Sequence, residues 1–326
     1  MKKETILLTG GGGQIGTALS AALRKIYGED QVIASDIKTP DEVEGRFIML
    51  DILNTQRMAE VIADYGITQI YHLAAILSAT GEWMPMKTWN VNFNALLQLF
   101  ELAKEKGIRK FFFPSTIAVF GASTPRKRTP QHTSLEPSTI YGISKLTGEL
   151  WSQYYFKKYG LDIRSVRYPG IISHETMPGG GTTDYAVEIF YKALEYQYYE
   201  CFLRADTYLP MIYMPDAIKG TLQLMEAPSN DLSIRTAYNL SGISFSPAEL
   251  AAAIQQVIPD FTIAYQPDFR QAIADSWPSD IDDSMARKDW NWNPTYDLEA
   301  ITKDMIRNLL IKLDRFIGSP TITTGQ

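Results

Sequence analysis

The first half of the chain alternates short apolar or β-branched runs with longer segments whose apolar residues recur at helical spacing. The predicted strands are residues 5–9, 31–34, 47–49, 69–75, 110–116 and 162–168. The predicted helices between them are an Ala/Leu-rich segment ending at Tyr27 and residues 56–65, 87–106 and 141–159. Such alternation is typical of a doubly wound parallel sheet, so we predict an α/β fold.

A glycine-rich turn joins the first strand to the first helix. The turn and helix start that we expect to bind a cofactor are Gly10, Gly13, Gln14, Ile15 and Gly16. The three glycines allow a tight turn, close approach of a pyrophosphate and close helix packing, and the helix N-terminus offers amide donors. Asp36 lies 20 residues after Gly16, where a carboxylate accepts hydrogen bonds from a ribose hydroxyl and repels a 2'-phosphate. This order predicts a Rossmann-type domain that binds NAD rather than NADP.

The regular alternation ends after Pro169. Residues 171–184 are loop-like, and further helices are predicted at 185–198, 213–226, 246–257 and 298–316. We therefore expect residues 1–172 to form the NAD-binding domain and residues 173–326 a smaller substrate-binding lobe, with a helix near 213–228 returning to the sheet.

Composition excludes several other classes of protein. The net charge is −6, and the one basic cluster, Arg126-Lys127-Arg128, is interpreted as a solvated loop, so no nucleic-acid partner is expected. Cys201 is the only cysteine, which excludes a disulfide framework. His72, His132 and His174 do not pair with it or with one another at ligand spacing, so we predict no metal site. A core strand begins directly after Glu4 and no apolar run is long enough to span a bilayer, so a cytoplasmic protein is expected.

Tyr141 and Lys145 stand one helical turn apart, so both side chains lie on one face of a predicted helix. An ammonium group near a phenol stabilises the phenolate and can make it a base near neutral pH. The spacing alone also fits an ordinary exposed amphipathic helix, so its meaning depends on the other motifs.

Together these motifs resemble the extended short-chain dehydrogenase/reductase family, whose members carry the glycine turn, the Asp, a later Ser or Thr and Tyr-x-x-x-Lys. Thr116, 25 residues before Tyr141, takes the place of the family's Ser or Thr, whereas Ser115 fits a turn-capping hydroxyl. The resemblance covers the first half of the chain. It implies an NAD-dependent enzyme in which Tyr141 is the base, Lys145 tunes it and Thr116 orients a substrate hydroxyl. It also implies a homodimer built from helices 87–106 and 141–159.

The resemblance assigns cofactor contacts to further positions. These are Asp51 and Ile52 beside the adenine, Leu73, Ala74 and Ala75 beneath the cofactor ribose, Asn92 in the active-site region, Tyr168 beside the nicotinamide, and Tyr141 and Lys145 themselves. Each also has a structural explanation: Asp51 as a helix cap, the alanines as packing residues and Asn92 as a satisfied polar group.

Rarer strings at residues 77–79, 178–185, 213–216, 275–278 and 281–284 resemble the short-chain L-threonine 3-dehydrogenases. This narrower resemblance implies oxidation of the 3-hydroxyl of L-threonine to 2-amino-3-oxobutanoate, with Ser78, Thr182 and Thr183 holding the polar ends of the small-molecule substrate. A nucleotide-sugar epimerase on the same scaffold and a non-catalytic NAD sensor stay open as alternatives.

The role of Asp36 is testable by substitution. Asp36→Ala should weaken discrimination against NADP, because the carboxylate that repels a 2'-phosphate is removed. Dissociation constants for NAD and NADP, measured for both proteins, check this. An unchanged ratio of the two constants would remove Asp36 from the cofactor site.

Overall fold

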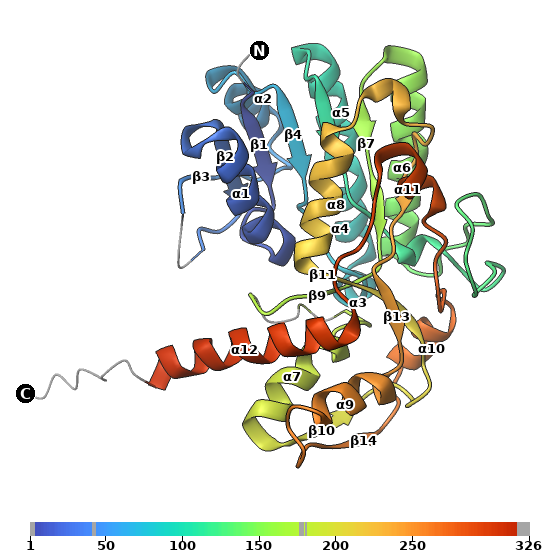
Figure 1. The fold of residues 1–326 in the computed structure, drawn as a ribbon. Helices are drawn as coiled ribbons and strands as arrows, with labels where there is room; N and C mark the ends of the chain where they lie inside the picture. The colour runs from blue at the N-terminus through green and yellow to red at the C-terminus, as the bar shows by residue number, and fades with distance from the viewer. Residues whose placement is uncertain (1–3, 41–43, 176–178, 180, 318–326) are drawn as a thin grey trace, which may run out of the picture.

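The computed structural model describes residues 4–40, 44–175, 179 and 181–317, and its central element is a six-stranded sheet (Figure 1). The strands lie in the order β3, β2, β1, β4, β5, β7. Their bounds are Ile6–Thr9 for β1, Val32–Asp36 for β2, Arg46–Met49 for β3, Gln69–His72 for β4, Lys110–Phe112 for β5 and Ile163–Arg164 for β7. Every neighbouring pair is parallel, which confirms the predicted α/β fold.

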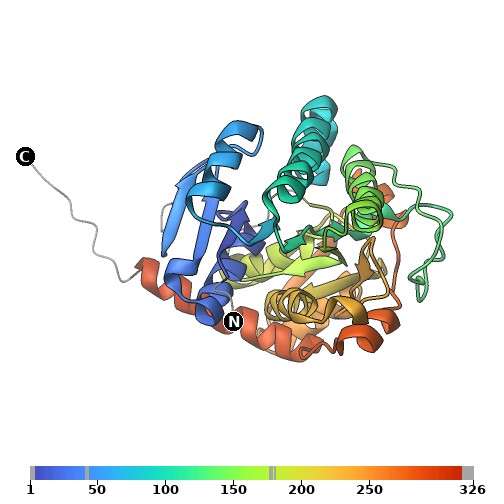
Figure 2. The ribbon, with the colours of Figure 1, turned by 90° about the horizontal axis from the view of Figure 1, so that it is seen from above.

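Helices cover both faces of this sheet. Successive residues of a strand point to opposite faces, and apolar residues on both faces of β1 are buried. Ile6 and Leu8 of β1 join a hydrophobic cluster with α1 (Gln14–Tyr27) and α8 (Met214–Glu226). Leu7 joins another cluster with α2 (Thr55–Asp64), α5 (Ala95–Lys106) and α6 (Ile140–Tyr159). Figure 2 shows the two layers from above. In the described ranges, no helix is both long and apolar enough to cross a membrane.

Two runs predicted as single strands each contain two strands in different sheets. β5 is followed by β6 (Ser115–Thr116), and β7 by β8 (Val166–Tyr168). β6 and β8 form a second sheet with β12 (Tyr238–Asn239). Pro114 separates β5 from β6, and a proline cannot donate to a strand ladder. The switch places Thr116 and Tyr168 opposite each other in register.

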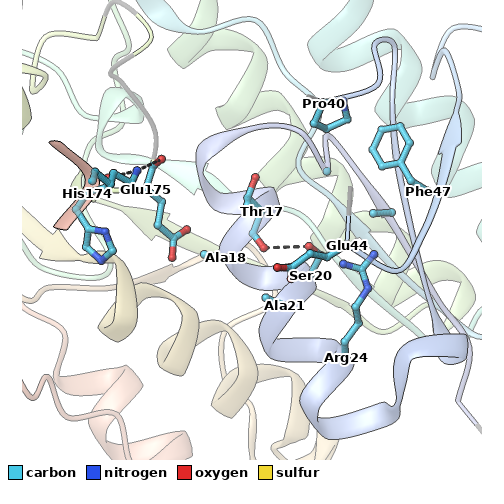
Figure 3. Close-up of a pocket in the computed structure, with 13 residues that line it drawn as sticks. Thr17, Ala18, Ser20, Ala21, Arg24, Pro40, Glu44, Phe47, His174 and Glu175 are labelled. Atoms are coloured by element: carbon cyan, nitrogen blue, oxygen red, sulfur yellow. Dashed lines mark hydrogen bonds between the residues drawn. The ribbon is translucent and has the colours of Figure 1, made fainter. Parts of the chain in front are cut away.

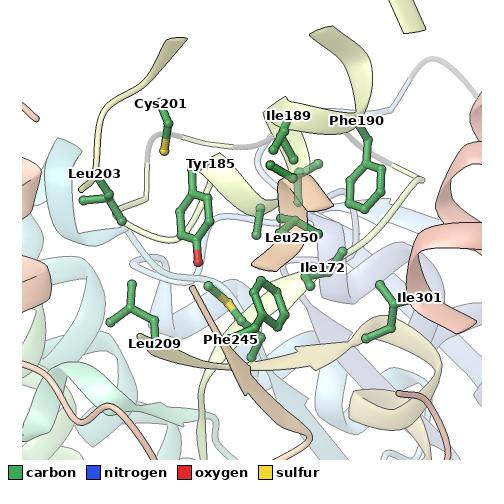
Figure 4. Packing of buried hydrophobic residues seen from close by; sticks show 14 of the residues in the cluster. Ile172, Tyr185, Ile189, Phe190, Cys201, Leu203, Leu209, Phe245, Leu250 and Ile301 are labelled. Carbon is green, nitrogen blue, oxygen red and sulfur yellow. The ribbon is translucent and has the colours of Figure 1, made fainter. Parts of the chain in front are cut away.

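A smaller lobe lies at the carboxyl end of the central strands (Figure 1). Its core is a cluster of fully buried apolar side chains that includes Tyr185, Phe190, Leu209 and Phe245 (Figure 4). The elements after β8, apart from α8 and β12, are β9 (Gly170–Ile172), α7 (Tyr185–Tyr196), β10 (Tyr198–Cys201), β11 (Leu209–Tyr213), β13 (Ile243–Phe245), α9 (Pro247–Gln255), β14 (Thr262–Tyr265), α10 (Arg270–Asp275), α11 (Ser284–Trp290) and α12 (Leu298–Ile317). Whether residue 172 separates two domains stays a prediction.

The helix predicted at 87–106 contains an irregular turn. It begins as α4 (Pro85–Trp89), continues through a π-helical turn at Asn90–Asn94 and ends as α5. Such π-bulges occur frequently at functional sites. Here the bulge carries Asn92, whose side-chain amide pairs with both backbone groups of Ile76, at 2.8 and 2.9 Å. Ile76 follows β4 and precedes α3 (Ser78–Trp83), so Asn92 fixes the segment leading to Ser78.

A buried ion pair ties α6 to the second sheet. Both oxygens of the Glu149 carboxylate accept hydrogen bonds from the Arg167 guanidinium, at 2.7 and 3.0 Å, and both side chains are almost completely buried. The Ser115 hydroxyl donates to the same carboxylate. Ser115 and Arg167 are register partners in β6 and β8, so Glu149 connects the helix to the residues directly before Thr116 and Tyr168.

We expect Glu149 and Arg167 each to stabilise the folded protein only while the other is present. Glu149→Gln or Arg167→Met alone leaves one buried charge unpaired and should lower the free energy of unfolding by about 3–5 kcal/mol. The double variant removes both charges, so its loss should be well below the sum of the single losses. Urea denaturation of the four proteins measures this, and additive losses would contradict it.

Candidate active site

The glycine turn after β1 has the geometry that a bound pyrophosphate needs. Gly10 has a φ of 76°, and a Cβ there would lie 2.6 Å from the amide nitrogen of Ala74. A Cβ on Gly16 would lie 2.1 Å from the carbonyl oxygen of Gly10, so this glycine lets α1 pack against the turn. Gly13 lines a cavity, and a Cβ there would lie 3.3 Å from the carbonyl oxygen of Gly10. The turn therefore brings a backbone with no side chains to the start of α1.

A cavity of about 420 Å³ lies beside this turn at the carboxyl ends of β1, β2 and β4. It is lined by the predicted cofactor residues Gly10, Gly13, Asp36, Asp51, Ile52, Leu73, Ala74 and Ala75. Asp36 accepts a hydrogen bond from the Gly12 amide at 3.1 Å, which holds its carboxylate beside the turn. Asp51 accepts from the Leu53 amide at 2.9 Å, while the cap of α2 is Asn54. The cavity fits an adenosine whose ribose reaches Asp36.

A second cavity, of about 180 Å³, holds the predicted catalytic residues. Thr116, Tyr141 and Lys145 line it together with the predicted cofactor contacts Gln14, Ile15, Leu73, Ala75 and Tyr168 and the predicted substrate contacts Ser78, Thr182 and Thr183. Leu73 and Ala75 line both cavities. A dinucleotide can therefore lie across the two, with its adenosine in the first and its nicotinamide in the second.

Lys145 is buried on the floor of this second cavity. Its ammonium group donates to the Pro114 carbonyl at 2.8 Å and lies 4.7 Å from the centre of the Phe113 ring. Burial lowers the pKa of Lys145 to about 7, because an ammonium group removed from water is less stable than the neutral amine. The ammonium nitrogen lies 5.6 Å from the centre of the Tyr141 ring, so the helix brings the pair together as predicted.

The pKa of Tyr141 differs from the expectation. Burial raises it to about 12, and a hydrogen bond from Thr116 opposes that shift. Without cofactor, Lys145 does not lower the pKa of Tyr141, because desolvation of the phenol dominates and the ammonium interacts with Pro114. The predicted lowering therefore requires positive charge from another source.

Thr116 and Ser115 have different environments, but the turn-capping role predicted for Ser115 belongs to Thr116. Thr116 forms the hydrogen bond to Tyr141, and its hydroxyl also accepts from the Ala118 amide at 3.2 Å. The Ser115 hydroxyl donates to the buried carboxylate of Glu149. Gly142, directly after the tyrosine, allows α6 to approach, because a Cβ there would lie 2.1 Å from the Ala118 carbonyl oxygen.

The predicted substrate residues lie on two sides of the cavity. Ser78 begins α3, and Thr182 and Thr183 precede α7. The Thr182 side chain is 1 % exposed, and its hydroxyl has no hydrogen-bond partner among the described residues. A buried hydroxyl without a partner is costly unless a ligand or water completes it. Pro178 and Gly180 of the same string lie outside the described residues.

Asp184 and Trp277 complete the cavity, although the sequence assigned neither of them a role. Asp184 contributes the only carboxylate among the described lining residues, and its oxygen accepts from the Gly181 amide at 2.6 Å. Trp277 lines the cavity from the loop after α10 and is 5 % exposed. Both stood in strings quoted for their family resemblance, which was the available signal.

Two predicted cofactor residues do not line either cavity. Gly16 is packed against Gly10, as its role in helix packing requires. Asn92 is 2 % exposed, and its amide is engaged with Ile76 and, at 3.5 Å, with the Ser144 hydroxyl. The structure therefore places Asn92 behind the site, where it fixes the segment before Ser78 instead of facing a ligand.

Another cavity, of about 370 Å³, lies on the outer side of α1 between Arg24 and the His174–Glu175 segment (Figure 3). The hydroxyls of Thr17 and Ser20 that face it bond to backbone carbonyls of their own helix. Thr116, Tyr141 and Lys145 are absent from its lining. We therefore place the chemistry in the other two cavities, which hold the predicted catalytic and cofactor residues.

Known proteins share this architecture. A model of the NAD dependent epimerase/dehydratase family matches residues 6–241. A solved GalE-like L-threonine dehydrogenase from Cupriavidus necator, in its holo form, is 52 % identical with a TM-score of 0.92, covering 94 % of this chain and 99 % of that one. A solved monomeric L-threonine 3-dehydrogenase from a metagenome is 47 % identical with a TM-score of 0.91, covering 94 % and 98 %.

A curated relative extends the same similarity. It is an uncharacterised epimerase/dehydratase of Staphylococcus haemolyticus, 47 % identical over 309 residues, which covers 93 % of this chain and 97 % of the relative. The match over most of the chain, together with the glycine turn, Asp36 and the Thr116, Tyr141 and Lys145 constellation, confirms the predicted family and its cofactor, NAD. The chain belongs to the NAD dependent epimerase/dehydratase family.

Proposed function

We propose that the protein oxidises the 3-hydroxyl of L-threonine to 2-amino-3-oxobutanoate with NAD. The observation that carries the proposal is the convergence of Thr116, Tyr141 and Lys145 in one small cavity whose other wall supplies a carboxylate and several hydroxyls. The similarity to solved L-threonine dehydrogenases over almost the whole chain supports the choice of substrate.

The lining of the cavity complements a zwitterionic amino acid, which carries an ammonium group and a carboxylate. Asp184 provides the negative charge for the α-ammonium group, while the hydroxyls of Ser78, Thr182 and Thr183 are donors for the α-carboxylate. Binding at these two ends presents the 3-hydroxyl to Thr116 and Tyr141. The buried Thr182 hydroxyl, which has no partner in the described protein, gains one in this arrangement.

The proposed reaction assigns a separate task to each catalytic residue. The residues that line the two cavities would hold NAD, which would supply the acceptor for the hydride from C3 and a positive charge beside Tyr141. That charge opposes the desolvation that raises the phenol pKa. Tyr141 then takes the proton of the substrate hydroxyl, which Thr116 orients, while Lys145 holds the nicotinamide ribose and stabilises the phenolate.

The alternative function is a nucleotide-sugar epimerase, which shares the scaffold and the tyrosine base. The second cavity measures about 180 Å³ and must also admit the nicotinamide. The carboxylate of Asp184 and the hydroxyls in its lining complement an amino acid. The solved proteins that are similar over almost the whole chain are L-threonine dehydrogenases, so oxidation of threonine is the better-supported function.

An assay with matched variants tests the proposal. Wild-type protein with NAD and L-threonine should form NADH, and serine and allo-threonine should react more slowly. Tyr141→Phe keeps the ring but removes the acid/base oxygen, so turnover should fall by about two to four orders of magnitude with little change in NAD affinity. Absence of net NADH together with turnover of a UDP-sugar would instead establish the epimerase. Near-normal turnover by Tyr141→Phe would mean that another group is the base.

Burial of Lys145 should be visible in stability. Its pKa is about 7 in the folded protein and ordinary, near 10.5, in the unfolded chain, so the unfolded chain binds more protons between these values. Wild-type stability should therefore rise with pH across this window. Lys145→Met removes the buried charge, so it should be more stable than wild type at about pH 7, and this advantage should shrink by about pH 10.

Urea denaturation without cofactor, with Lys157→Met as an exposed control on the same helix, measures this effect. A pH-independent difference between Lys145→Met and wild type would show that Lys145 is not desolvated in solution.

The proposal includes a homodimer and a cytoplasmic location. Ile143, Leu150 and Tyr154 are exposed and lie on one stripe of α6, opposite the face that carries Tyr141 and Lys145. An apolar stripe of this kind fits association with a second copy, although one similar protein is described as monomeric. Sedimentation of the purified protein distinguishes the two states. The location rests on the single, buried Cys201.

A further inference from the structure

The basic cluster Arg126-Lys127-Arg128 lies on the wall of a large cavity outside the catalytic site. This cavity measures about 700 Å³ and shares no lining residue with the active-site cavity. The rest of its wall comes from the β10–β11 connection, from β13, and from the end of α10 with the loop after it: Arg204, Asp206, Thr207, Tyr208, Ser244, Asp275, Ser279 and Asp280. Its volume lies in the range of small-molecule sites.

The basic segment is exposed, as expected of a solvated loop, but its backbone is anchored. The Arg126 carbonyl accepts from the Ser279 amide at 2.8 Å and from the Asp280 amide at 3.2 Å. Thr129, which is completely buried, donates its amide to the Asp280 carbonyl at 3.0 Å. Between these anchors Arg128 has a φ of 46°. A residue other than glycine in this region stores strain, which is found preferentially at functional sites.

Two of the three carboxylates around the cavity pair with Arg204, whereas no ion pair is formed by the basic cluster in the described chain. Arg204 binds Asp275 through two hydrogen bonds, at 2.8 and 3.1 Å, and lies 3.6 Å from Asp206. Asp280 accepts from the amide of Ile281 at 2.8 Å.

In contrast, none of the three basic cluster residues forms an ion pair within the described chain. Arg126 donates to the Asp275 carbonyl at 2.8 Å. Arg128 acts on Asp282 at longer range, where it adds to a backbone hydrogen bond from Ser284 in lowering that pKa. Three cations without a contacting carboxylate at one cavity, in a chain of net charge −6, create a local site for negative charge.

The cavity wall also supplies hydrogen-bond donors suited to phosphate or carboxylate oxygens. Guanidinium groups bind such oxygens through paired donors, and the lysine adds a mobile charge. The Ser244 hydroxyl is buried at this wall and has no partner in the described protein. We propose that this cavity binds a small anion carrying two or more phosphate or carboxylate groups.

The same wall connects this cavity to the active site. Asp275 and Ser279 line the basic cavity, and Trp277 between them lines the catalytic one. Arg126 and Arg204 hold Asp275 from the outer side. An anion bound to Lys127 and Arg128 restrains the neighbouring Arg126, whose guanidinium holds the Asp275 carbonyl. It therefore fixes the loop that carries Trp277, and it lowers the KM for threonine. This kinetic effect rests on the proposed function, whereas the binding itself does not.

Calorimetry with two probes tests the site. Tripolyphosphate and citrate are titrated separately into NAD-saturated protein, so that the cofactor site is filled. At least one probe should bind wild type, and Lys127→Gln/Arg128→Gln should weaken it about tenfold. Lys157→Gln/Lys158→Gln, an exposed pair on α6 with the same change in charge, should bind as wild type does. Binding of only one probe identifies the ligand as a phosphate or a carboxylate compound.

The absence of heat with both probes, or equal weakening in both double variants, overturns the site. In the kinetic arm, saturating probe should lower the threonine KM of wild type about twofold or more, but not that of Lys127→Gln/Arg128→Gln. An unchanged wild-type KM together with measured binding overturns the coupling. If the protein does not oxidise threonine, the proposed function fails and calorimetry still decides the site.

Discussion

The ion pair of Glu149 and Arg167 determines how the catalytic helix sits against the strands that complete the site. Glu149 lies one turn beyond Lys145 and two beyond Tyr141 on the same face of α6. Its carboxylate is held by Arg167 and Ser115, which directly precede Tyr168 and Thr116. Because separating a buried ion pair costs about 3–5 kcal/mol, displacement of the helix along these strands is disfavoured. This position of α6 aligns Tyr141 with the Thr116 hydroxyl that orients the substrate.

Local patterns predicted most of the first half of the fold, apart from the switch of β6 and β8 into a second sheet and the π-helical turn before α5. Strands of a parallel sheet are buried on both faces and therefore appear as apolar runs, and the glycine turn, the start of α1 and Asp36 form one local unit. The lobe was harder to predict, because strands such as β10 and β14 are defined by pairing across a long separation in the sequence. The same reason hides Asp184 and Trp277, which meet only after the lobe has folded.

The protonation of the site could not be predicted from spacing. Tyr-x-x-x-Lys places the two side chains on one face, but the Pro114 carbonyl and the Phe113 ring attract the ammonium group, and burial dominates both pKa values. The free protein thus contains a tyrosine that resists deprotonation beside a lysine whose pKa is about 7. Burial of this pair destabilises the cofactor-free protein, and the tyrosine becomes an effective base when a cofactor adds positive charge beside it. We therefore expect the pKa of Tyr141 to fall only in the complex with NAD.

One helix, α6, carries the base on its inner face and an exposed apolar stripe on its outer face. A rigid helix cannot move one face without the other, since neighbouring turns share their backbone hydrogen bonds. Polar replacement of Ile143 or Leu150, for example to improve solubility, therefore alters the same helix that positions the Tyr141 phenol. The safest positions for tags, labels or immobilisation are consequently those remote from α6.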